Sequence, residues 1–171
     1  MSKKSLKTKR KDIKCNPTFW KYFYVYLRSI LIPLLVGWIV WWIMSSFIDY
    51  EVLKNPFLAP PSITFPIVWT ILYILMGVSH WILDSNNQMD KKLTILYYSQ
   101  LWVNALWSIF FFVLKWRLFS FIWIILLDIL VIWMAIMMYK KNKTAGLLQI
   151  PYILRILFAT YLTLAFYLLN N

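Results

Sequence analysis

The sequence is poor in the residues that build several familiar kinds of site. Among 171 residues there is one cysteine, one histidine and three glycines. The lone cysteine, Cys15, excludes an intrachain disulfide and a cysteine-based zinc cluster, and we predict no metal site. The glycines, at 37, 77 and 146, form no GxxxG pair, so a tight glycine-mediated helix dimer is not expected.

Charged residues are also scarce, at 14% of the chain, against about 25% in ordinary soluble domains. Hydrophobic residues make up 62%, with eleven tryptophans, which is more apolar surface than a soluble fold of this size can bury. Five apolar runs reach the length of about 20 residues that a spanning helix needs. They cover residues 23–47, 63–83, 93–114, 118–139 and 147–169.

Lipid leaves no alternative partner for backbone amides, so these runs are predicted to be helices. The alternating pattern of a membrane barrel is missing. We therefore predict an all-α membrane protein, a bundle of five transmembrane helices in one domain over 23–171. Residues 1–22 form a basic arm that precedes it.

Basic residues predict the orientation. The net charge is +12, and lysines and arginines crowd the arm and the loops after the second and fourth spans. By the positive-inside rule the N-terminus is cytoplasmic and the C-terminus is outside. Because this charge adjoins a membrane span, we expect lipid head groups rather than nucleic acid as its partner.

The second span has a marked start and one aromatic face. Pro60 and Pro61 cannot continue a helix but are tolerated in its first turn, so they fix where the span begins. Trp69, Tyr73, Met76 and His80 follow at i, i+4, i+7 and i+11, along one stripe.

Two further spans carry polar groups at membrane depth. On the third span, Asn104 shares a face with Trp107, and a buried amide is costly unless it is paired or faces a cavity. On the fifth, Arg155 shares a face with Ala159. At a rise of 1.5 Å per residue, the depths of Asn104, Trp107 and Ala159 agree with those of Trp69 and Tyr73. These five side chains could therefore face one cavity.

Three motifs now carry a family resemblance. "LKNPFLAPP", followed by "FPIVWTILYILMG", is similar to the first loop and second helix of the TspO/MBR family, the tryptophan-rich sensory proteins that include the mitochondrial translocator protein. "QLWVNALWSIFFF" resembles that family's third helix, and "PYILRILFATYLTLAFYLLN" its fifth. The resemblance covers about residues 30 to 170.

The resemblance implies a pocket beneath the first loop that binds porphyrins. No cofactor is required, but protoporphyrin IX or haem is the implied ligand, alongside other lipophilic molecules. Such bundles are often dimeric, so a homodimer is an open alternative. The residues predicted to bind ligand are Tyr50, Pro60, Pro61, Trp69, Tyr73, Asn104, Trp107, Arg155 and Ala159. Aromatic stripes at this spacing also arise from packing alone.

Arg155 is a departure from the family, which usually has a tryptophan there. A charge inside a span is a functional-site hypothesis by default. Three placements are open for Arg155. It could snorkel to the cytoplasmic interface, face the cavity and pair with a ligand carboxylate, or pair with Asp128. His80 is expected near the inner surface, bonded to Asp84 or water, with an axial haem ligand as the less favoured alternative.

The function predicted from these features is that of a membrane binding or sensory protein for a porphyrin or similar lipophile. A light-dependent porphyrin-degrading enzyme and a transporter are the alternatives, and no catalytic residue is predicted. The missing tryptophan at 155 weighs against the enzyme, and the lack of an inverted repeat weighs against the transporter. We expect the protein in a bacterial cytoplasmic membrane.

Overall fold

The structure is a computed structural model that describes the backbone of residues 17–47 and 64–170, and side chains from residue 23 onward. It confirms the predicted fold class: in these residues every regular element is helical, and five helical stretches are long and apolar enough to cross a membrane. These stretches are Phe23–Ser45, Thr64–Ser85, Lys91–Val113, Arg117–Lys141 and Lys143–Leu169.

The elements follow one another with short turns. In chain order they are α1 (Pro17–Ser45), α2 (Thr64–Ser85), α3 (Lys91–Ser108), the π-helix η1 (Ile109–Val113), α4 (Arg117–Lys141), α5 (Lys143–Leu147) and α6 (Ile150–Leu169).

Local chemistry sets several of the helix ends. The Asp90 carboxylate accepts the Leu93 N–H at 2.8 Å and caps α3. The Asn142 side chain accepts the Ala145 N–H at 3.2 Å and caps α5. Each cap satisfies one of the amides that a helix start leaves without a partner inside the helix. Pro151 lies in the first turn of α6, where a missing N–H costs nothing.

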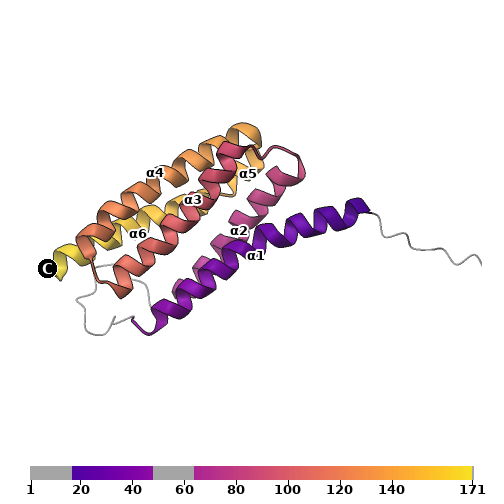
Figure 1. The fold of residues 1–171 in the computed structure, drawn as a ribbon. Helices are drawn as coiled ribbons and strands as arrows, with labels where there is room; N and C mark the ends of the chain where they lie inside the picture. Colours follow the sequence, from indigo (N-terminus) through magenta and orange to yellow (C-terminus); the bar gives the residue numbers. More distant parts are fainter. Residues whose placement is uncertain (1–16, 48–63, 171) are drawn as a thin grey trace, which may run out of the picture.

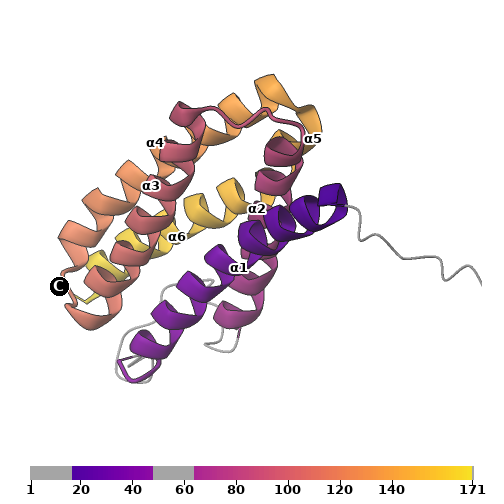
Figure 2. The same ribbon diagram turned by 45° about the vertical axis from the view of Figure 1, so that its right-hand side comes forward.

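Three features of these helices differ from the expectation of five uninterrupted spans. α1 begins at Pro17, before the expected start at residue 23. The third span changes from α- to π-helix at Ile109, and the fifth is divided between α5 and α6. Pro33 lies inside α1, where it removes a backbone hydrogen bond and favours a bend, and α1 is visibly bent (Figures 1 and 2).

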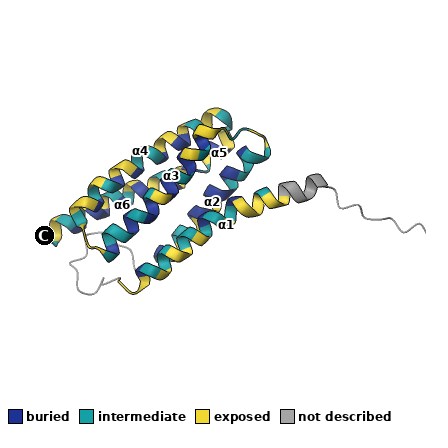
Figure 3. Cartoon of the chain, viewed as in Figure 1, coloured by how far each residue is buried: buried dark blue, intermediate teal, exposed yellow. Residues whose placement is uncertain are grey.

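The helices pack in two groups. α1 lies along α2, and α4 lies along both α3 and α6 (Figure 2). α3 is the most enclosed spanning helix and α1 the least. Buried residues face inward and exposed ones face outward along each helix (Figure 3), as expected for a bundle whose outer surface contacts lipid.

One end of the bundle carries most of the described charge, and we call it the basic end. Lys91 and Lys92 lie there in the first turn of α3, and Lys143 lies at the start of α5. Two ion pairs tie helices together nearby: Arg28 bonds Asp84 at 2.8 Å, and Lys141 bonds Asp90 at 2.8 Å.

The half of the bundle next to the basic end, the basic half, has a closely packed interior. Gly77 lets α2 approach α1 so closely that a Cβ there would lie 2.7 Å from the Ser29 carbonyl oxygen. The Ser29 hydroxyl and His80 Nδ1 are 2.8 Å apart and buried. Farther in, the Tyr152 hydroxyl donates to Gln100 Oε1 at 2.7 Å.

Candidate functional site

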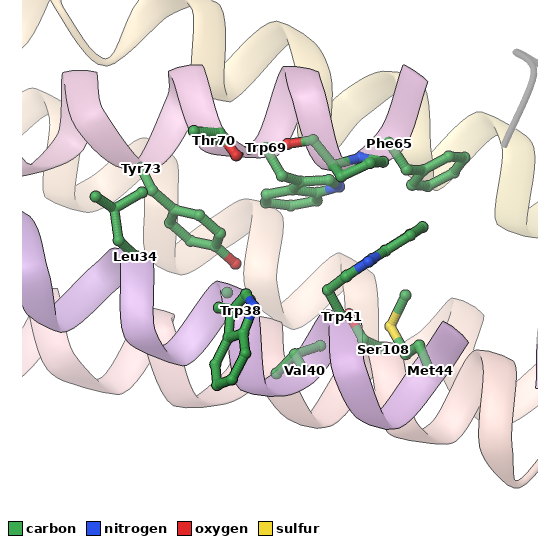
Figure 4. A pocket seen from close by; sticks show the side chains of 12 residues that line it. Leu34, Trp38, Val40, Trp41, Met44, Phe65, Trp69, Thr70, Tyr73 and Ser108 are labelled. Carbon is green, nitrogen blue, oxygen red and sulfur yellow. Dashed lines mark hydrogen bonds between the residues drawn. The ribbon is translucent and has the colours of Figure 1, made fainter. Parts of the chain in front are cut away.

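A cavity of about 290 Å³ lies between α1 and α2 in the half of the bundle opposite the basic half, and we call it the main cavity. Figure 4 shows aromatic side chains of both helices pointing into it. α3 contributes one residue to its wall. The described residues that line it are Leu34, Gly37, Trp38, Val40, Trp41, Met44, Phe65, Pro66, Trp69, Thr70, Tyr73 and Ser108.

Gly37 shapes one wall of this main cavity. The ring of Tyr73 lies in the space that a Cβ at position 37 would occupy. The glycine therefore lets a large aromatic ring from α2 lie flat against α1. Because the obstacle is the ring of a side chain, a methyl group at position 37 would displace Tyr73 rather than the helix backbone.

Trp69 and Tyr73 form the aromatic face of α2 that the sequence predicted. Their ring centroids are 5.5 Å apart at an interplanar angle of 32°, and both rings line the main cavity. Asn104 supports this face from α3, since its side-chain amide donates to the Tyr73 hydroxyl at 3.4 Å. Asn104 Oδ1 is buried and has no hydrogen-bond partner among the described residues.

The described residues that were expected to share one cavity are divided between two. Trp107, Arg155 and Ala159 do not line the main cavity. They line a second, much smaller one of about 10 Å³. Phe65 belongs to both linings. The described residues of the second lining are Phe65, Trp107, Phe111, Phe112, Arg155, Ala159, Leu162, Thr163 and Phe166.

Large aromatic rings cause this division. Phe65 packs edge-on against Phe112 with centroids 6.1 Å apart, and Trp107 stacks on Phe111 at 5.5 Å. These rings fill the middle of the single cavity that the similar depths of the predicted residues had suggested.

Arg155 lies at the junction of the two cavities. Its guanidinium carbon is 5.1 Å from the Phe65 ring centroid, 5.7 Å from that of Trp69 and 5.7 Å from that of Phe158. All three are within cation–π range. Phe65 lies in the first turn of α2, at the end of the bundle opposite the start of α6, so the Arg155 side chain leans away from the end where α6 begins. This is not the placement that snorkelling predicted.

Asp128 has another partner. Its Oδ2 accepts the Thr160 hydroxyl at 2.8 Å, and its buried Oδ1 accepts no hydrogen bond within the described part of the chain. Of the three placements considered for Arg155, the structure shows the one in a cavity wall. Carboxylate binding at that wall stays a prediction.

His80 differs from the expectation of an interfacial residue bonded to Asp84. It is buried, with Nδ1 close to the Ser29 hydroxyl and its ring 4.5 Å from that of Tyr97. Asp84 instead bonds Arg28. His80 lines neither cavity, and the described residues contain no group of three metal-ligating side chains.

Sequence reasoning missed the contribution of α1. Six residues of α1 line the main cavity, including Trp38 and Trp41. Their i, i+3 spacing was the one signal for this face, but α1 is apolar on all sides, and its hydropathy does not show which face turns inward. Tyr50, Pro60 and Pro61, which were also predicted to bind ligand, lie outside the described residues.

The sequence resembles known proteins over most of its length. The model of the TspO/MBR family matches residues 29–168. The chain is 41% identical over 122 residues to the "Tryptophan-rich protein TspO" of Archaeoglobus fulgidus, covering 71% of this chain and 79% of that protein. It is 32% identical over 145 residues to the "Translocator protein homolog" of Schizosaccharomyces pombe, covering 82% and 88%. It is 30% identical over 125 residues to "Protein CrtK" of Rhodobacter capsulatus, covering 71% and 78%.

Proposed function

Because the chain belongs to the TspO/MBR family and is a multi-pass integral membrane protein, we propose that it is a binding and sensory protein for a porphyrin or a similar flat lipophile. The ligand lies in the main cavity, between the aromatic faces of α1 and α2. A protein of Cereibacter sphaeroides named "Tryptophan-rich sensory protein" is among its relatives.

The observation that carries this proposal is the composition of the cavity wall. Trp41 of α1 points toward the side of the main cavity that Trp69 and Tyr73 of α2 form (Figure 4), and Trp38 also belongs to the lining. A flat conjugated ring gains dispersion and quadrupole interactions with such walls. Ser108 and Thr70 supply few polar contacts, in keeping with a ligand site that is mostly apolar.

The cavity volume constrains how the ligand lies. About 290 Å³ is near the lower end of the range for small-molecule pockets, roughly 300–1,000 Å³. Trp38 in its wall is 66% exposed, so the cavity reaches the outer surface of α1. A macrocycle therefore lies with one edge between α1 and α2 and the rest toward lipid.

We also propose that the basic end faces the cytoplasm of a bacterial cell. Lys91, Lys92 and Lys143 lie at this end, together with Lys140 and Lys141, as the positive-inside rule requires. Labelling Cys15 with a membrane-impermeant maleimide tests this orientation. Reaction only after the cells are permeabilised supports it, and reaction in intact cells contradicts it.

The ligand is tested by titrating protoporphyrin IX in the dark into protein in lipid nanodiscs while following the Soret band. We expect a saturable shift. Trp69→Ala removes the largest ring of the α2 wall and should weaken binding by about 5- to 150-fold, since stacking on an aromatic side chain contributes about 1–3 kcal/mol.

Trp102→Ala is the matched control. Trp102 lies on α3, is 67% exposed and lines neither cavity, so its removal should leave the titration unchanged. If no saturable shift appears in the unmodified protein, or if the two variants behave alike, the proposed site is wrong.

A further inference from the structure

The second cavity presents hydrogen-bond donors inside an apolar shell. Trp107 is 4% exposed, and its Nε1 is buried without a hydrogen-bond partner among the described residues. An indole N–H can only donate, and so can a guanidinium. Thr163, which also lines the cavity, already donates its hydroxyl hydrogen to the Ala159 carbonyl at 2.7 Å.

Among the described residues, the charge at this cavity has one sign. Arg155 is the one described residue in either lining of a type that carries a full charge at neutral pH. The other described residues of the second lining are aromatic or aliphatic apart from Thr163. A cation held in a membrane span, beside a buried donor that lacks an acceptor, forms an environment that stabilises an anion with acceptor oxygens.

We propose that the second cavity is an acid-group site, in which Arg155 and the Trp107 N–H hold a carboxylate of the ligand. This rests on the proposed function, because the apolar body of the same ligand lies in the main cavity. The ligand class is thereby narrowed to lipophilic carboxylic acids. A planar carboxylate fits the two-pronged geometry of a guanidinium.

Phe65 connects the two cavities. It lies in both linings and beneath the Arg155 guanidinium. A volume of about 10 Å³ is only enough for about one water molecule, which is less than a carboxylate needs. The acid group therefore enters when the Phe65 ring turns away from Phe112, and this movement opens the second cavity to the first.

The test compares protoporphyrin IX with its dimethyl ester, which has the same ring system but no acid. Both are titrated into the unmodified protein in nanodiscs made of neutral lipid. We expect the acid to bind more tightly by on the order of 10- to 100-fold, the range for a hydrogen bond to a charged group.

Variants then assign the preference to residues. Arg155→Gln should bring the acid and the ester to similar affinities, by weakening the acid alone. Arg155→Lys should keep part of the preference, and Trp107→Phe should reduce it severalfold. Arg28→Gln is the matched control, since Arg28 is paired with Asp84 near the basic end and its loss should leave the preference intact.

The possible failures are distinguishable. If neither compound binds the unmodified protein, the proposed function is wrong, and the acid-group site is wrong with it. If both bind with equal affinity, the acid-group site is overturned while the proposed function stands. A preference that survives in Arg155→Gln also overturns the site. The comparison of acid and ester in the unmodified protein tests the site even if a variant does not fold.

Discussion

The two halves of the bundle differ in how closely their helices pack. In the basic half Gly77 brings α2 directly against the backbone of α1. In the opposite half Gly37 faces the ring of Tyr73 rather than backbone, and both described cavities lie there. Buried polar atoms without a partner among the described residues occur in both halves, on Gln149 in one and on Trp107 in the other. The difference in packing therefore indicates that the basic half maintains the fold while the opposite half leaves room for a ligand.

Gly77→Ala should have the largest effect on stability. A Cβ at position 77 would lie 2.7 Å from the Ser29 carbonyl oxygen and 2.8 Å from the Ile30 Cα, both backbone atoms of α1. The two helices must separate, and overpacking of this kind costs about 1–3 kcal/mol. The midpoint of thermal unfolding in detergent, followed by circular dichroism, should fall. An unchanged midpoint would show that α1 and α2 separate without cost.

Tyr152→Phe should destabilise the basic half by a smaller amount. The change removes the hydroxyl that donates to Gln100 Oε1 and leaves that oxygen buried without its donor, at a cost of about 1–2 kcal/mol. Chemical unfolding in mixed micelles measures the loss. Tyr139→Phe is the control, because Tyr139 is 45% exposed. Equal effects of the two substitutions would contradict the role given to the pair.

Gly37→Ala should separate stability from binding. The added methyl group meets the ring of Tyr73 rather than backbone, and the better helix propensity of alanine, by about 1 kcal/mol, offsets part of the strain. We expect an unfolding midpoint close to that of the unmodified protein but weaker protoporphyrin binding, because the displaced ring enters the main cavity. A fall in stability as large as that of Gly77→Ala would remove the contrast between the halves.

The smallest effect concerns the ion pair at the basic end. The hydrogen bond from Lys141, followed by that from the Leu93 amide, lowers the pKa of Asp90 below its ordinary value of 3.8. A group with a lowered pKa contributes stability above its unfolded-state value and loses it as the pH falls through the folded value. The contribution of Asp90 should thus be constant at neutral pH and disappear below about pH 4. The free energy of unfolding, measured as a function of pH, should therefore fall less steeply at acid pH in Asp90→Asn than in the unmodified protein. An identical fall in both proteins would contradict the contribution given to Asp90.

The overall fold could be predicted from hydropathy because lipid leaves the backbone no alternative to helices. The aromatic face of Trp69 and Tyr73 and the inward position of Asn104 followed from spacing and from the cost of a buried amide. The division into two cavities could not be predicted. It depends on how far the rings of Phe65 and Phe112 extend between helices, which residue depth does not reveal.

The sequence could not decide among the three placements of Arg155 for a related reason. The lean of helical side chains toward the N-terminus favours snorkelling, but the rings of Phe65, Trp69 and Phe158 lie around the guanidinium in the opposite direction. Tertiary contacts of this kind are set by neighbouring helices and leave no periodic signal in the sequence.

The π-helix η1 has a consequence for how the second cavity responds to the insertion or deletion of one residue. A π-turn accommodates one residue more than the α-helical turn around it, so η1 is equivalent to a single inserted residue. It lies where Phe111 and Phe112 enter the second lining. Deleting one residue between 109 and 113 would restore a regular α-helix and rotate one phenylalanine relative to the other helices by about 100°. A change of one residue in the length of η1 would thus reshape the second cavity in a single step, without a substitution at any residue of its wall.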